Sequence, residues 1–226
     1  MRNVISTPSF CVASGIAGLA GVVLLGISFA INTGPPSSAT NTDLIRFGQQ
    51  NYASILWGAW MQAVGPALIV LFALSLVHLA GAAQRLAGWM ALFGASTLMT
   101  VSLIEITFYI GALHSDPPVM PMASLSIISA VQHLYFIVAA PALFFPLGLV
   151  LVGSPILPRV FGYAALLLAV AFSTLGAAYM LTLTLPARVT ALGSIQAVWW
   201  LSAAIAIIVW GGRLIVAQTR GHSKQS

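Results

Sequence analysis

Two ionisable residues lie deep inside apolar stretches of the sequence, where they could do chemistry. Glu105 is the only acidic residue within such a stretch, and His133 lies in the apolar stretch that follows. A carboxyl and an imidazole at similar depth in neighbouring helices can act as general acid and base, or bind a polar group of a ligand. Tyr109 follows Glu105 by four residues, which places it on the same face of a helix. We therefore predict a polar cluster of Glu105, Tyr109 and His133.

The composition shows what kind of element must hold this cluster. Hydrophobic residues make up 60% of the 226 residues and charged residues 5%, with a mean hydropathy of +1.03; a soluble domain would have about 25% charged residues. Six continuous apolar segments reach the roughly 20 residues that a helix needs to cross a bilayer, and none alternates as a spanning β-strand does. We predict a single all-α domain, a bundle of six transmembrane helices. They are expected near residues 9–32, 54–79, 86–112, 124–151, 160–183 and 191–212.

The outer loop at residues 33–53 is the only long connection between these segments. It opens with Gly34-Pro35-Pro36, which ends the first helix, and residues 43–48 could form a short interfacial helix. The first apolar run is longer than the core of about 7–15 residues in a signal peptide, so we expect the first helix to be retained. A processed five-helix form is the alternative, because Ser37-Ser38-Ala39 is similar to a cleavage site.

The basic residues predict the orientation of the bundle. Positive charge collects at the cytoplasmic ends of membrane helices. Arg46 and Arg188 fall on one side of the predicted bundle, and the other six fall on the opposite side: Arg2, Arg85, Arg159, Arg213, Arg220 and Lys224. We predict that both termini are cytoplasmic. Topology thus accounts for the net charge of +5, and the absence of a basic patch interleaved with aromatic residues argues against nucleic acid as a partner.

Aromatic and amide side chains near the ionisable pair define a candidate ligand site. Trp57 and Trp60 start the second helix, where tryptophans are typical of interfacial anchors but could also form the rim of a pocket. An outward-opening site between the second, third and fourth helices would take a small amphipathic or lipophilic molecule. Its lining would be Trp57, Trp60, Glu105, Tyr109, Gln132, His133 and Tyr135.

An internal repeat organises the helices. Residues 85–92 and 159–166 share the pattern R-x-x-G-aromatic-x-A-L, residues 65–68 and 140–143 precede them at nearly the same distance, and residues 132–140 resemble 196–204. We infer helical hairpins repeated in one orientation, formed by helices 1–2, 3–4 and 5–6. Chance likeness between apolar segments is the alternative. In this alignment Glu105 corresponds to Tyr179 and His133 to Ala197, so the ionisable pair belongs to the middle hairpin alone.

Metal and cofactor chemistry is not predicted. Cys11 is the only cysteine, which excludes an intrachain disulfide and a multi-thiolate metal site. Glu105, His114 and His133 could hold a divalent metal with Asp116 nearby, but they form no compact ligand motif. The sequence also has no phosphate-binding loop for ATP and no lysine within an apolar segment for a retinal Schiff base.

The stretch Leu157-Pro158-Arg159-Val160-Phe161-Gly162 resembles the helix-opening signature of uncharacterised bacterial multi-pass inner-membrane proteins of the domain-of-unknown-function kind. This resemblance implies a bacterial cytoplasmic membrane and membrane lipid as surroundings, and it supplies no catalytic residue. Three functions stay open. The first is binding or transport of a small amphipathic molecule. The others are an intramembrane isomerase or cyclase with Glu105 and His133 as acid and base, and an accessory subunit of a homo-oligomer or larger membrane complex.

Overall fold

The computed structural model describes residues 8–32, 39–114, 122–182 and 186–222, and within these ranges the regular structure is entirely helical. The six longest apolar helical stretches can each cross a membrane, which confirms the predicted all-α bundle of six transmembrane helices. In chain order the elements are α1 (Pro8–Ile31), α2 (Asn41–Gln50), α3 (Tyr52–Leu79), α4 (Leu86–Leu113), α5 (Met122–Leu134), the π-helical turn η1 (Tyr135–Ala139), α6 (Ala140–Val152), α7 (Arg159–Thr182) and α8 (Pro186–His222).

Two elements differ from the sequence-based expectation. The fourth predicted helix is continuous but contains η1, where Ala140 N–H bonds to Tyr135 O, five residues back. Pro141 explains this turn, because it has no N–H and its ring clashes with the carbonyl of the residue four positions earlier. The sixth helix is longer than the predicted 191–212. It begins at Pro186, whose fixed φ suits the first turn of a helix.

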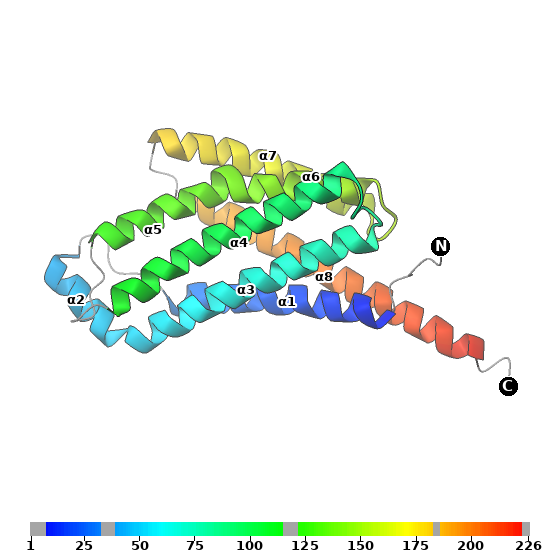
Figure 1. The fold of residues 1–226 in the computed structure, drawn as a ribbon, viewed down its shortest axis with the longest axis horizontal. Helices are drawn as coiled ribbons and strands as arrows, with labels where there is room; N and C mark the ends of the chain where they lie inside the picture. The colour runs from blue at the N-terminus through cyan, green and yellow to red at the C-terminus, as the bar shows by residue number, and fades with distance from the viewer. Residues whose placement is uncertain (1–7, 33–38, 115–121, 183–185, 223–226) are drawn as a thin grey trace.

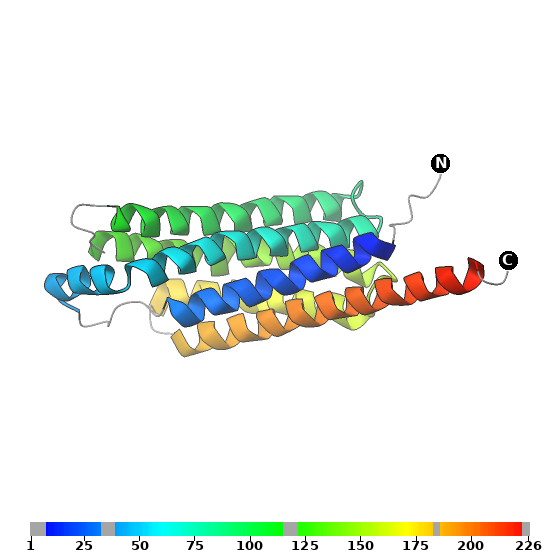
Figure 2. The same cartoon turned by 90° about the horizontal axis from the view of Figure 1, so that it is seen from below.

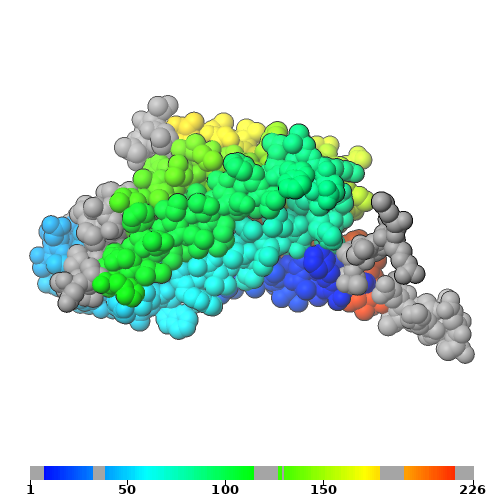
Figure 3. Space-filling model, viewed as in Figure 1, coloured from blue at the N-terminus to red at the C-terminus, as the bar shows by residue number. Residues whose placement is uncertain are grey.

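The six long helices lie side by side and run roughly parallel to one long axis (Figures 1 and 2). The main contacts of α1 are with α3 and α8, α4 packs between α3 and α6, and α7 packs mainly on α6. Figure 3 shows α3 and α4 covering one face of the bundle. The first two inferred hairpins are therefore pairs of packed neighbours. The third is looser, since α8 lies chiefly against α1 and only lightly against α7.

Small residues let α1 approach both of its neighbours closely. A Cβ on Gly15 would lie 2.8 Å from the Ala204 carbonyl oxygen of α8, and one on Gly21 would lie 2.7 Å from the Gly65 carbonyl oxygen of α3. Such close backbone approach is typical of helix packing in membranes, where the lipid gives helices little hydrophobic reason to associate. The first helix thus joins α3 to α8.

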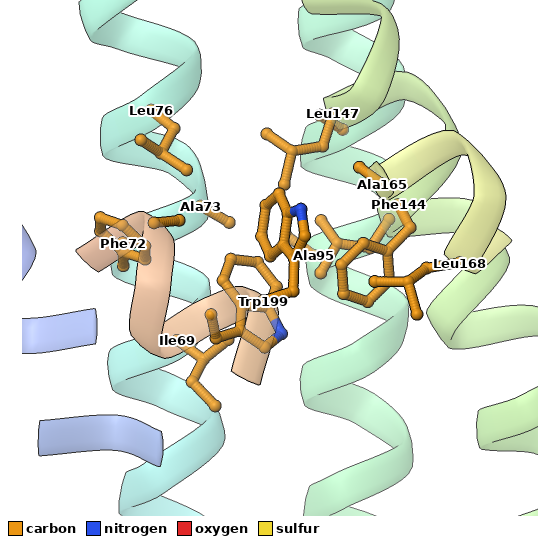
Figure 4. Close-up of a cluster of buried hydrophobic side chains, with 14 of the residues drawn as sticks. Ile69, Phe72, Ala73, Leu76, Ala95, Phe144, Leu147, Ala165, Leu168 and Trp199 are labelled. Carbon is orange, nitrogen blue, oxygen red and sulfur yellow. The ribbon is translucent and has the colours of Figure 1, made fainter. Parts of the chain in front are cut away.

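Aromatic rings fill the centre of the bundle. Trp199 and Trp200 of α8 meet edge to face at 4.7 Å, and Phe144 of α6 lies 5.3 Å from each of them, measured between ring centroids. Figure 4 shows Trp199 in this core, with Phe72 of α3 on one side and Phe144 on the other. The indole N–H of Trp199 donates to Phe161 O at 3.0 Å. The N-terminal half of α8 is therefore packed against α3, α6 and α7 through large buried rings.

The short helix α2 forms where a short interfacial helix is expected. Its capping box is complete: Asp43 N–H donates to Thr40 Oγ1 at 3.3 Å, and Thr40 N–H donates to Asp43 Oδ2 at 3.0 Å. The Thr40 hydroxyl also donates to Asp43 Oδ2 at 2.6 Å. These hydrogen bonds hold the pKa of Asp43 below its ordinary value.

Candidate ligand-binding site

Glu105 is buried on α4 although it is the only acidic residue in the membrane-spanning helices that the structure describes. Its side chain is 7% exposed. An ionisable group near the centre of a bilayer costs about 2.5–3.5 kcal/mol on insertion scales, so its presence calls for polar partners. Those partners come from two neighbouring helices.

Two glutamine amides surround the Glu105 carboxyl. Gln132 of α5 donates from Nε2 to Glu105 Oε1 at 2.8 Å, and the Gln62 side chain of α3 lies near the same carboxyl. The two amides differ in access. Gln62 is 5% exposed, whereas Gln132 belongs to the exposed residues of the bundle surface. The carboxyl therefore links α3, α4 and α5, and it is reached from outside through Gln132.

Pro66 explains why Gln62 belongs to this cluster. Proline has no N–H, so Pro66 cannot donate to the carbonyl of Gln62, four residues earlier in α3. Ser102 of α4 supplies the missing donor, and its hydroxyl bonds Gln62 O at 2.9 Å. Ser102 lies three residues before Glu105 and faces the same way. The kink-prone position of α3 is thus held against the turn of α4 that carries the carboxyl.

The other predicted members lie around this core. Tyr109, one turn beyond Glu105, is half-buried and close enough to interact electrostatically with its carboxyl. His133 is buried on α5 at 9% exposure, but the hydrogen bond from this helix to Glu105 comes from the preceding residue, Gln132. The catalytic pairing of Glu105 with His133 stays a prediction.

The remaining predicted residues are not brought to Glu105. Tyr135 lies in η1, and its hydroxyl donates to Gln196 Oε1 of α8 at 2.6 Å, so it belongs to a second polar contact between the fourth and sixth spans. Trp57 and Trp60 form an edge-to-face pair with centroids 5.9 Å apart, and they are 60% and 50% exposed. Exposure suits membrane anchoring. The predicted lining thus divides into three separate groups.

Sequence reasoning missed Gln62 and Ser102. A usable signal was present, because Gln62 is a polar residue in an apolar run and precedes Pro66 by four positions. A freed carbonyl within a membrane helix needs a donor from a neighbouring helix or water.

His114, considered as a metal ligand, is exposed at the end of α4, and its Nδ1 contacts Ile110 O at 2.9 Å. Asp116 lies outside the described residues.

The geometry limits what the cluster can do. A buried carboxyl with neutral amide partners can accept hydrogen bonds from an ammonium, a hydroxyl or an amide N–H, and the exposed Gln132 amide can in addition donate and accept.

Comparison of the chain with protein-family models, with curated proteins and with solved structures finds no match. Function is therefore argued from the site itself.

Proposed function

We propose that this integral membrane protein binds a small amphipathic molecule, whose hydrogen-bond donor takes the place of Gln132 at Glu105. One observation carries the proposal: a buried acceptor, Glu105 Oε1, is bonded at 2.8 Å by an exposed amide. Replacing one donor by another preserves the number of hydrogen bonds on the carboxyl, so the exchange costs little. Gln132 then acts as a stand-in for the ligand.

The surroundings of the site favour an amphipathic ligand. Phe108 and Tyr109, three and four residues beyond Glu105, are half-buried and pack against Ala112 and Ile128, and Ile128 lies four residues before Gln132 on the same face of α5. They offer apolar surface next to the polar entry at Gln132. A molecule with a donor head and a hydrocarbon or aromatic body satisfies both, whereas a fully polar solute leaves this apolar surface uncovered.

Fluorescence titration of the purified protein in nanodiscs tests the proposal. The probes are dansylcadaverine, which ends in a primary ammonium, and its alcohol analogue. Glu105→Gln should weaken binding of the amine at least tenfold, equivalent to about 1.4 kcal/mol, and weaken the alcohol less, because only the amine loses a charge partner. Gln132→Ala should retain or strengthen binding, since it removes the internal competitor.

The matched control is Thr107→Val, two residues from Glu105. Thr107 is exposed, and its hydroxyl bonds only within α4, to Leu103 O at 2.8 Å. This variant should bind both probes as the parent does. Equal amine binding in the parent and in Glu105→Gln, or loss of binding in Gln132→Ala with the fold intact, would show that the carboxyl is a structural clamp between helices.

Transport requires in addition that the helices around the site move, so that the bound molecule can cross the membrane. Pro66 interrupts the hydrogen bonding of α3 beside the site, and a helix that already lacks a bond bends there more readily. Pro66→Ala should therefore slow dansylcadaverine uptake into proteoliposomes and leave its affinity unchanged. Uptake at the parent rate would restrict the function to binding.

A further inference from the structure

A groove of about 640 Å³ lies on the outer surface between α4, α6 and α7. Its volume falls within the range of about 300–1,000 Å³ that small-molecule sites occupy. It is separate from the Glu105 cluster, which lies towards the other end of α4 and between α3 and α5. Its lining includes Trp89, Phe93, Phe145, Pro146, Val170 and Thr174.

The groove presents hydrocarbon to its occupant. The side chains of Trp89, Phe93 and Phe145 are 58%, 67% and 46% exposed along it. The two hydroxyls in its wall are used internally, since Ser173 donates to Ala169 O at 2.9 Å and Thr174 donates to Val170 O at 3.0 Å. An apolar chain matches this lining, and a polar ligand would find no free donor in these two side chains.

Two arginines lie at the starts of two of the helices that line the groove. Arg85 caps α4 and Arg159 begins α7, both are exposed, and Figures 1 and 2 place these helix starts at the same end of the bundle. At a rise of 1.5 Å per residue, Trp89 lies about 6 Å beyond Arg85 and Thr174 about 22 Å beyond Arg159. With these two helix starts taken as level, the groove lining covers about 15 Å of depth, which is half of a hydrocarbon core of about 30 Å.

These arginines have no carboxylate near them in the part of the chain that the structure describes. The sequence holds three acidic residues. Asp43 lies in α2 at the opposite end of the bundle (Figure 1), Glu105 lies in the far half of α4, and Asp116 falls outside the described residues. The positive charge beside the groove is thus complementary to an anion supplied from outside the chain.

We propose that this groove binds one acyl chain of an anionic phospholipid, whose headgroup is held by Arg85 and Arg159. The depth matches one leaflet, the lining matches hydrocarbon, and the charge at its end matches a phosphate. Each arginine near a membrane surface contributes about 1 kcal/mol to binding an anionic lipid. The inference is independent of the function proposed for Glu105.

Native mass spectrometry of the full chain, titrated with phosphatidylglycerol or phosphatidylcholine, tests the headgroup contacts. The parent should bind phosphatidylglycerol more tightly, and Arg85→Gln with Arg159→Gln should weaken it by about thirtyfold, the equivalent of about 2 kcal/mol. Arg213→Gln is the control, because Arg213 is exposed in α8 and does not line the groove. Equal binding of the two lipids, or an equal loss in Arg213→Gln, overturns the proposal.

A second pair of variants tests the groove itself. Val170→Trp should fill it and lower the occupancy of phosphatidylglycerol, whereas Leu167→Trp should not. Both positions are exposed on α7, at 58% and 71%, and only Val170 lines the groove, so folding should be affected alike. Unchanged lipid binding in Val170→Trp overturns the proposal, as does the mass of a dimer with no bound lipid, which would mean that a second copy covers the groove.

Discussion

The contacts of α4 with α3 and with α6 each involve a proline, in different ways. Where α4 packs on α3, Pro66 leaves the Gln62 carbonyl without its usual donor, and Ser102 bonds that oxygen at 2.9 Å. Where α4 packs on α6, Pro146 does the same to the carbonyl of Ala142. There α4 presents Gly94, and a Cβ at this position would lie 2.2 Å from the Ala142 oxygen.

This difference separates a polar contact from an apolar one. A hydroxyl donor fixes the α3 contact and brings polar side chains together around Glu105. A bare glycine fixes the α6 contact by close approach, and the surface beside it becomes the apolar groove. The same backbone defect thus leads to a hydrogen-bonded cluster in the contact with α3 and to close packing in the contact with α6.

The largest expected effect comes from filling the glycine contact. Gly94→Ala should lower the free energy of unfolding by about 3 kcal/mol, because its methyl group would collide with backbone atoms of α6. Gly111→Ala, in the same helix, is the matched control, since a Cβ there would have nothing within 4 Å; it should be neutral or stabilise by up to about 1 kcal/mol. Denaturant unfolding in mixed micelles measures both. Similar values for the two would mean that Gly94 is not needed for close approach.

The next prediction tests the hydrogen bond from the Ser102 hydroxyl to the Gln62 carbonyl. Ser102→Ala should cost about 1–3 kcal/mol, because it leaves the buried Gln62 carbonyl without a donor. In a Pro66→Ala background the residue at position 66 regains an N–H and can bond that carbonyl within α3, so the same substitution should cost less than half as much. A double-mutant cycle measures this coupling. An unchanged cost in both backgrounds would show that Pro66 is not what makes the hydroxyl necessary.

A third proline, Pro141, shows a further outcome and a smaller effect. Here the helix forms η1, and Tyr135 within that turn donates to Gln196 at 2.6 Å. Tyr135→Phe should lower stability by about 1 kcal/mol. Tyr163→Phe serves as control, because Tyr163 is 54% exposed on α7, and it should leave the unfolding midpoint in place. A midpoint equally unaffected in Tyr135→Phe would make the contact with α8 energetically irrelevant.

The sequence predicts the helices of this fold better than it predicts which side chains meet between them. Continuous apolar runs of sufficient length fix the number of spanning helices, and Glu105 is recognisable because a carboxyl in such a run needs partners. The residue that bonds it is not recognisable, since Gln132 and His133 are adjacent and point about 100° apart around the helix axis. Tertiary packing and the η1 turn set that rotation, and neither appears in a hydrophobic pattern.

The inferred repeat likewise predicts neighbours only in part. Matching segments lead to three equivalent hairpins, and α1 with α3 and α4 with α6 pack as expected. The last pair does not pack as closely, because the glycine-lined face of α1 accepts α8 at Ala204. Backbone proximity between helices distant in sequence depends on which small residues face each other, so the order of spans alone could not reveal it.

The smallest expected effect isolates the role of Pro66. Ser28 of α1 donates to Gly58 O of α3 at 2.8 Å, and Ser28 is fully buried at 0% exposure. By distance and burial this bond matches that of Ser102. Gly58, however, lies four residues before Gln62, and the Gln62 N–H can donate to the Gly58 carbonyl within α3. Removing the Ser28 hydroxyl therefore leaves no carbonyl without a donor. Ser28→Ala should therefore cost about 0.6 kcal/mol, the average for side-chain hydrogen bonds measured within a membrane protein.

Unfolding Ser28→Ala and Ser102→Ala under the same micelle conditions gives the decisive ratio. A loss several times larger for Ser102→Ala means that the defect at Pro66, and not the hydroxyl bond as such, makes the α3–α4 contact costly to break. Equal losses would mean that burial alone sets the value of a hydroxyl bond to α3. The contrast between the two contacts of α4 would then rest on the close approach at Gly94 alone, since the contact with α3 would have no special need for its donor.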